Sequence, residues 1–223
     1  MQDIIRNKLT SIQRIEATTD RISSDDVFEK ILNSDIEKIR KTLEESNKED
    51  FYNAVDTIIS AKRIYIVGTR SASALARFLA YYFNLMFENA RFINTASTSE
   101  MFEQIMRIEK GDVMIGISFP RYSKQTAKAL SFAAGNGAKV VAITDSQNSP
   151  IAEYSTHTLI AKSDMASFVD SLVAPMSLIN ALIIAIGIKK QYEIKANFEH
   201  LESIWDKYDV YEKHNEDKEI TLK

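Results

Sequence analysis

Short apolar segments alternate with amphipathic ones through most of this chain. The apolar segments are four to eight residues long and rich in branched or aromatic residues, which is typical of buried strands. They span residues 63–67, 91–94, 111–118, 139–144 and 157–161. Apolar residues recur at helical spacing between and after them, and the helices that this pattern predicts span 72–88, 97–108, 123–134 and 168–188.

Strands that are apolar almost throughout, each followed by a helix, are typical of a parallel sheet with both faces covered. Crossover connections between parallel strands are right-handed, so successive helices can cover both faces of an open sheet. The pattern therefore predicts an α/β fold, a three-layer α/β/α sandwich on a five-stranded parallel sheet.

Further helices are predicted on either side of this α/β region. Ser34 with Glu37, and Ser46 with Glu49, have the spacing of capping boxes, which predicts two helices that begin at these points. Residues 191–210 resume helical character before a charged tail. The predicted divisions are N-terminal helices and linker over 1–47, the α/β domain over 48–190, and a C-terminal helix with its tail over 191–223.

The helix predicted at 168–188 approaches the length of a membrane span, which needs about 20 apolar residues. Asp170, Pro175 and Asn180 interrupt its apolar run, so burial in protein fits this segment better than a lipid environment. A helix that is apolar on most sides also suits a subunit interface. We therefore expect no membrane partner and expect a homodimer or a higher homo-oligomer that forms through this helix.

Composition narrows the function classes. The 223 residues are 45% hydrophobic and 26% charged, as in an ordinary globular protein. The net charge of −3 disfavours a chain that binds nucleic acid by itself. There is no cysteine and no His/Asp/Glu cluster with metal-ligand spacing, so we expect no metal and no cofactor. The start, MQDIIRNKLTS, lacks the apolar region of a secretory signal, and we expect a cytoplasmic protein.

Two loops that follow predicted strands carry more polar groups than a turn needs. In open parallel sheets, ligands bind beyond the carboxyl ends of the strands, and each of these loops leads into a helix whose N-terminus attracts anions. Hydroxyls add neutral donors, and arginines add charge and a bidentate fork. The candidate ligand-binding residues are Gly68, Thr69, Arg70, Ser71 and Ser73 in the first loop, and Ser118, Arg121, Tyr122 and Ser123 in the second.

These nine residues predict a site for the phosphate of a small polyhydroxylated molecule. For either loop alone, the simpler interpretation is helix capping, because Ser and Thr are common N-cap residues. Two such loops at the same edge of one sheet favour the binding site.

The order of elements and these two loops resemble the sugar isomerase (SIS) domain, a flavodoxin-like fold, over about residues 48–190. That family shows G-x-G-x-S in the first loop and S-x-S-G-x-T in the second. Gly68 and Ser118 match, whereas Arg70 and Arg121 each stand where the family motif has a glycine. Three further motif positions are occupied here by Ala72, Pro120 and Ser123. The resemblance implies phosphosugar binding at these loops.

VGTRSAS paired with SFPRYS is most similar to the effector domain of RpiR-type transcriptional regulators. In that family a helix-turn-helix DNA-binding domain precedes the SIS domain, and RNKLTSIQRIE, at residues 6–16, resembles the exit from it. The resemblance implies a phosphosugar-sensing effector domain of a regulator of sugar metabolism that is not an enzyme. DNA would then be contacted only through an N-terminal domain that this sequence lacks.

An aldose–ketose phosphosugar isomerase is the alternative, because SIS domains also serve isomerases. That reaction needs a general base beside the sugar. The candidates are Glu100, Glu103, Glu153 and His157. Glu100 fits a helix cap, Glu103 and Glu153 fall on predicted solvated faces, and His157 fits a structural role. These assignments favour a receptor with no catalytic residue.

Overall fold

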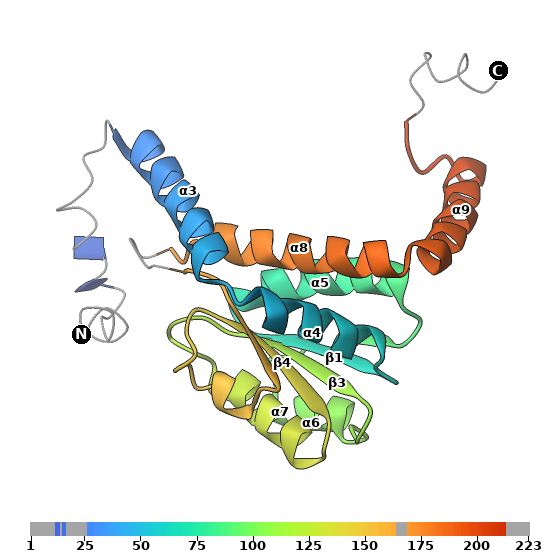
Figure 1. The fold of residues 1–223 in the computed structure, drawn as a ribbon, viewed down its shortest axis with the longest axis horizontal. Helices are drawn as coiled ribbons and strands as arrows, with labels where there is room; N and C mark the ends of the chain where they lie inside the picture. The colour runs from blue at the N-terminus through green and yellow to red at the C-terminus, as the bar shows by residue number, and fades with distance from the viewer. Residues whose placement is uncertain (1–11, 14, 17–25, 164–168, 213–223) are drawn as a thin grey trace.

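Five parallel strands form one sheet in the order β2-β1-β3-β4-β5. The structure is a computed structural model that describes residues 12–13, 15–16, 26–163 and 169–212 (Figure 1). The strands are β1 (Ile64–Gly68), β2 (Ala90–Phe92), β3 (Val113–Ile117), β4 (Lys139–Thr144) and β5 (His157–Ile160). The strand order reverses between β1 and β3, which makes the carboxyl ends of these two strands the expected ligand position in such a sheet.

Helices cover both faces of the sheet, so the predicted three-layer α/β/α sandwich is confirmed. The helices are α3 (Val27–Glu45), α4 (Lys48–Ile59), α5 (Ala72–Met86), α6 (Thr98–Ile105), α7 (Lys124–Gly135), α8 (Val173–Lys189) and α9 (Gln191–Lys207), with a short 3₁₀ helix η2 (Ala152–Tyr154). Figure 1 shows α4, α5 and α8 over one face and α6 and α7 over the other.

Alternate residues of the central strands point into different layers. On β1, Ile64 and Ile66 join the core beneath α4, α5 and α8, whereas Tyr65 and Val67 join the core beneath α6 and α7. All five residues of β1 are buried. Burial on both faces explains why these strands read as unbroken apolar runs.

The first N-terminal capping prediction is wrong. Helix α3 begins at Val27, so Ser34 lies inside it and caps no helix. The preceding turns are themselves rich in helix-forming residues and carry an i,i+4 ion pair between Asp26 and Lys30. The capping signal is therefore embedded in a sequence that is already helical.

The second capping prediction is wrong by one residue. The N-cap of α4 is Asn47, whose side chain accepts a hydrogen bond from the backbone N–H of Asp50 at 3.1 Å. The Ser46 hydroxyl instead donates to the carbonyl of Thr42 at the end of α3. Ser46 therefore belongs to the end of one helix and not to the start of the next.

The long apolar helix begins later than predicted. Helix α8 starts at Val173, residues 169–172 form an irregular segment before it, and residue 168 lies outside the described residues. Within the part of the chain that the structure describes, no single helix is long and apolar enough to cross a membrane; α8 and α9 pass that test only together, across a bend of 99°. Residues 1–11, 14, 17–25 and 213–223 of the predicted terminal segments also lie outside the described residues.

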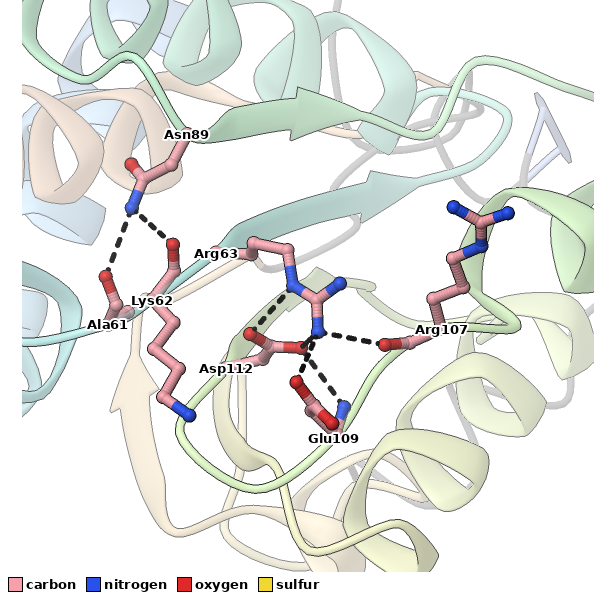
Figure 2. Close-up of polar contacts among 7 residues, drawn as sticks. All are labelled: Ala61, Lys62, Arg63, Asn89, Arg107, Glu109 and Asp112. Carbon is pink, nitrogen blue, oxygen red and sulfur yellow. Dashed lines mark hydrogen bonds and ion pairs between the residues drawn. The ribbon is translucent and has the colours of Figure 1, made fainter.

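An ion pair joins the amino ends of β1 and β3 (Figure 2). Asp112 is fully buried, and its carboxylate accepts from Arg63 Nε at 3.0 Å and contacts Arg63 Nη2 at 2.8 Å. The same nitrogen donates to the carbonyl of Arg107 and to Glu109. The hydrogen bond to Asp112 raises the pKa of Arg63 above its ordinary value. This contact fixes the two central strands relative to one another.

We expect Asp112→Ala to lower the free energy of unfolding by about 3 kcal/mol, because it leaves a half-buried guanidinium without its carboxylate. Glu109→Ala is the matched control: it removes an exposed carboxylate from the same arginine and costs less than about 1 kcal/mol. Urea unfolding followed by circular dichroism measures both. Equal losses for the two variants would show that the buried pair does not hold the strands.

Candidate functional site

A cavity of about 320 Å³ lies at the carboxyl ends of β1 and β3. The loop after β1 contributes one wall and the loop after β3 contributes the other. The lining residues are Thr69, Arg70, Ser71 and Ala72 from the first loop, Ser118, Phe119, Pro120, Arg121 and Ser123 from the second, and Asp170 from the segment before α8. The two predicted loops therefore meet at one hollow in this fold.

The predicted site residues divide between this cavity and its surroundings. Gly68 and Ser73 line a neighbouring cavity of about 490 Å³, which shares Thr69, Arg70 and Ser123 with the first. Tyr122 lines neither cavity, and its hydroxyl donates to Asp145 at 2.8 Å. The other six predicted residues are Thr69, Arg70, Ser71, Ser118, Arg121 and Ser123, and all of them line the first cavity.

Both loop arginines adopt a left-handed backbone conformation. The φ angle is 58° at Arg70 and 62° at Arg121. At both of these positions the SIS motifs have glycine. An L-residue with a Cβ pays about 1–2 kcal/mol in this conformation. Backbone strain of this kind is found at ligand sites, where the surroundings hold it in place. Each loop thus keeps the bend that suits glycine and adds a guanidinium to it.

Gly68 is a third position in these loops with a strict steric demand. A Cβ added there would lie 2.8 Å from the carbonyl oxygen of Ala72 and 3.0 Å from the Ala76 side chain. The glycine therefore lets the first turn of α5 approach the end of β1. That close approach places the N-terminus of α5 at the edge of the cavity.

Capping explains Ser123 but not Ser71. Ser123 is the N-cap of α7, and its hydroxyl oxygen accepts from the N–H groups of Gln125 at 3.2 Å and Thr126 at 3.3 Å. Ser71 holds the N-cap position of α5 but makes no side-chain cap hydrogen bond. Its hydroxyl donates to Asp170 Oδ2 at 3.1 Å. The first loop therefore presents a polar group that its own helix does not use.

Ser118 is a buried hydroxyl in the wall of the cavity, with 3% of its surface exposed. Its oxygen accepts from the N–H of Ser123 at 3.1 Å. Because that contact uses the oxygen as an acceptor, the Ser118 O–H remains able to donate. A hydroxyl donor beside a helix N-terminus and a guanidinium is a combination that favours an anionic oxygen.

Tyr122 holds the second loop against the end of β4. Burial raises the pKa of Asp145 above its usual range, although hydrogen bonds from Tyr122 and Thr144 oppose that rise. Burial and the neighbouring Asp145 carboxylate also raise the pKa of Tyr122. The tyrosine therefore stays protonated at neutral pH, and its hydroxyl donates a hydrogen bond to Asp145. This hydrogen bond makes Tyr122 an anchor of the loop.

Sequence reasoning missed Asp170 as a cavity residue. The apolar pattern around it predicts a helix from residue 168, which would make Asp170 a polar interruption on a helix face. In the structure Asp170 precedes α8, in an irregular segment, and its carboxylate reaches Ser71 of the first loop. One signal in the sequence could have indicated its role: Asp170 is a charged residue near the start of a long apolar run.

None of the four residues that the sequence offered as the general base of an isomerase lines this cavity. His157 is at the amino end of β5, where Nδ1 is 2.7 Å from Asp50 Oδ1 and Nε2 is 3.0 Å from Thr57 Oγ1. Glu100 accepts a hydrogen bond from Thr95, Glu103 lines a separate cavity, and Glu153 is exposed. The histidine therefore joins α4 to the amino end of β5, whereas the cavity lies at the carboxyl ends of the strands.

A family model for the SIS domain matches residues 57–185, more than half of the chain. The chain therefore belongs to the SIS-domain family, and the resemblance seen in its loops is confirmed. The match includes both loops, from Gly68 through Ser123, and Asp170.

Several relatives are transcriptional regulators. The chain is 26% identical over 191 residues to an HTH-type transcriptional regulator of Caldanaerobacter subterraneus subsp. tengcongensis, a match that covers 82% of this chain and 66% of that regulator. It spans about half to two thirds of the length of the curated regulators it matches. The sugar isomerase domain of an RpiR transcription factor from Sphaerobacter thermophilus superposes with a TM-score of 0.76 at 26% identity, over 80% of this chain and 99% of that one.

More distant structures also share the fold. The NanR protein of Vibrio vulnificus, solved in complex with ManNAc-6P, gives a TM-score of 0.71 at 19% identity and covers 83% of this chain and 70% of its own. The phosphoheptose isomerase GmhA of Neisseria gonorrhoeae gives 0.61 at 16% identity, over 74% of this chain and 98% of its own. Regulators and isomerases thus both share this fold.

The left-handed arginines lead to a stability prediction. Without added ligand, we expect glycine at position 70 or 121 to be more stable than alanine there by about 1 kcal/mol, because alanine retains the Cβ penalty. Arg40, an exposed residue inside α3, is the control, and there glycine should be less stable than alanine by about 1 kcal/mol. Urea unfolding of the six variants tests this reversal of sign. The same order at all three positions would contradict it.

Proposed function

We propose that this chain is the phosphosugar-sensing effector part of a transcriptional regulator of sugar metabolism, acting in the cytoplasm. The observation that carries the proposal is the pair of loops around one cavity, each with hydroxyl groups and a left-handed arginine. The regulators among the relatives support the same function. DNA would be contacted by a helix-turn-helix domain on the N-terminal side, and residues 1–47 would form the connection to the SIS core at 48–190.

The ligand's phosphate would dock on the second loop. Ser118 and Ser123 supply hydroxyls, the N-terminus of α7 supplies its positive dipole end, and Arg121 supplies charge. The sugar hydroxyls would then face Thr69 and Ser71 on the first loop, with Arg70 between the two cavities. NanR, which shares the fold, was solved with a phosphorylated amino sugar, and this supports the choice of ligand class.

A thermal-shift screen of phosphosugars tests the proposal, since a ligand at 100 times its Kd stabilises a protein by about 2.7 kcal/mol. For any phosphosugar that binds, we expect Arg121→Gly to weaken binding by about 10- to 100-fold, because a charge-assisted hydrogen bond is lost while the loop keeps its bend. Lys195→Gln removes an equal charge from α9, which lines neither cavity, and should leave Kd unchanged. A screen with no binding phosphosugar would count against the proposed function.

The isomerase remains the alternative because phosphosugar isomerases share the fold. Among the residues that the structure describes, Asp170 is the one carboxylate that lines the cavity, so it replaces the four glutamate and histidine candidates as the group to examine. Each phosphosugar that binds would be incubated with the protein and assayed for its aldose or ketose isomer. Turnover that is lost in Asp170→Asn would favour the enzyme, and binding without turnover would favour the receptor.

We also propose that the chain forms a homodimer through α3 and α8. Leu32, Ile36, Ile39 and Leu43 form an exposed apolar stripe on α3 at spacings of four, three and four residues. Ile184 and Ile188 are exposed on α8, the helix for which a subunit interface is predicted. Exposed apolar side chains on both helices favour association.

We expect the double variant Ile184→Glu/Ile188→Glu to be monomeric in analytical ultracentrifugation, because two carboxylates would be buried at the interface. Tyr192→Glu on α9 is the control, since it adds the same charge at an exposed aromatic residue outside the proposed interface. A double variant that still dimerises would place the interface elsewhere, and a monomeric wild-type protein would refute the proposal.

A further inference from the structure

The cavity already holds an anionic group of the protein itself. Asp170 lines it, and its Oδ2 accepts from the Ser71 hydroxyl at 3.1 Å. Ser71 is at the N-cap position of α5 and its hydroxyl does not cap that helix. This carboxylate therefore places a negative charge in the cavity that the ligand's phosphate would enter.

A phosphate that enters this cavity competes with Asp170. Phosphate monoesters carry between one and two negative charges near neutral pH, and like charges that share a small site repel. In the proposed binding mode the phosphate sits on the second loop and a sugar hydroxyl faces Ser71. The phosphate therefore repels Asp170 within the same cavity, and the sugar hydroxyl can take over the contact with Ser71. Asp170 belongs to the irregular segment before α8, whereas Ser71 is fixed at the start of a helix, so Asp170 is the group that can move.

The residue next to Asp170 contacts α3. The Ser171 hydroxyl donates to Asp35 Oδ1 at 2.7 Å, and the same oxygen accepts from Lys38 Nζ at 3.1 Å. The Lys38 side chain is only 6% exposed. A buried ion pair depends on further hydrogen bonds to offset its lost hydration, and Ser171 provides one of them. A movement of Asp170 would therefore shift the neighbouring Ser171 and weaken its hydrogen bond to Asp35 on α3.

A second contact ties α3 to the segment after β5. The backbone N–H of Lys162 donates to Thr42 Oγ1 at 2.9 Å, and Lys162 Nζ pairs with Glu45. The helix is thus attached near its C-terminal end as well as at Asp35. Figure 1 shows α3 extending away from the sheet beyond its contact with α8. Loss of the Ser171 contact would leave α3 attached mainly through its last turns.

We propose that the Asp170 carboxylate occupies the cavity in the ligand-free protein, so that phosphate binding displaces it from Ser71 and thereby releases Ser171 from Asp35 on α3. The proposal rests on the proposed function of the cavity and assigns to it a means of regulation. It supplies what ligand-driven switching requires, which is a contact that differs between the bound and unbound arrangements.

Binding measurements test the first step. Inorganic phosphate and glucose 6-phosphate would be titrated by calorimetry into the wild-type protein and Asp170→Asn. Loss of the competing charge should tighten phosphate binding by about tenfold. If Asp170 instead accepts hydrogen bonds from sugar hydroxyls, Asp170→Asn would leave phosphate binding unchanged and weaken glucose 6-phosphate, and this would overturn the proposal.

Hydrogen exchange of residues 27–45 tests the second step. Phosphate should speed exchange in α3 of the wild-type protein. In Ser171→Ala, exchange should be fast from the start and should not respond to phosphate, and phosphate should bind about threefold more tightly because no contact has to break. Ser203→Ala on α9 is the control and should behave as wild type. If bound phosphate leaves the exchange rate of α3 in the wild-type protein unchanged, the proposal is overturned.

The two proposals fail in different ways. If neither phosphate nor any phosphosugar binds the wild-type protein, the proposed function fails and the Asp170 mechanism fails with it. If phosphosugars bind but Asp170→Asn binds phosphate no more tightly, only the mechanism fails.

Discussion

The in-register parallel pairing of β1 with β3 is the constraint on which the site depends. Ile64 pairs with Val113 at the start of the two strands and Gly68 with Ile117 at their ends. Two parallel strands that end at the same level release their loops at the same level, and here the chain leaves them toward helices on opposite faces. A cleft between the two loops follows from that divergence. The buried contact between Arg63 and Asp112 holds the same pair of strands at the other end (Figure 2).

The chemistry of the cleft departs from a plain phosphate cradle through its two arginines. In a glycine-rich loop, backbone N–H groups and hydroxyls do the binding and the left-handed bend costs little. Here the same bend carries a long cationic side chain in both loops, at a cost in backbone strain. Contact between the guanidinium groups and the ligand would offset that cost. Asp170 adds a negative charge to the same cavity as the two arginines. The cleft is therefore rich in charge of both signs.

The fold could be predicted from the sequence because its signals are local and repeated. Each central strand is buried on both faces, so each appears as a short apolar run, and the helix between two runs fixes the parallel arrangement. The meeting of the two loops also followed from the sequence, since it needs only the rule that parallel strands share a carboxyl edge. The helix boundaries were harder to predict from the sequence. Ser34 has the spacing of a capping residue, but the residues before it also form helix.

Side-chain contacts between distant segments could not be predicted. Asp170 and Ser71 are 99 positions apart, and nothing in either local sequence indicates that they meet. Tyr122 sits among residues that line the cavity, yet its hydroxyl turns toward Asp145, the residue that follows β4. In both cases the decisive partner comes from another part of the chain. Local patterns identify which loops face the ligand, whereas the partner of each side chain depends on the packing of the whole domain.

The left-handed bends at Arg70 and Arg121 have an evolutionary consequence. Every arginine codon becomes a glycine codon by a single-base change, and a backbone that already has the shape glycine prefers would accept that change without repacking. The cavity could therefore gain or lose either positive charge while the protein stays folded throughout. Related chains could diversify the ligands they recognise at these two positions alone, leaving the sheet and its helices untouched.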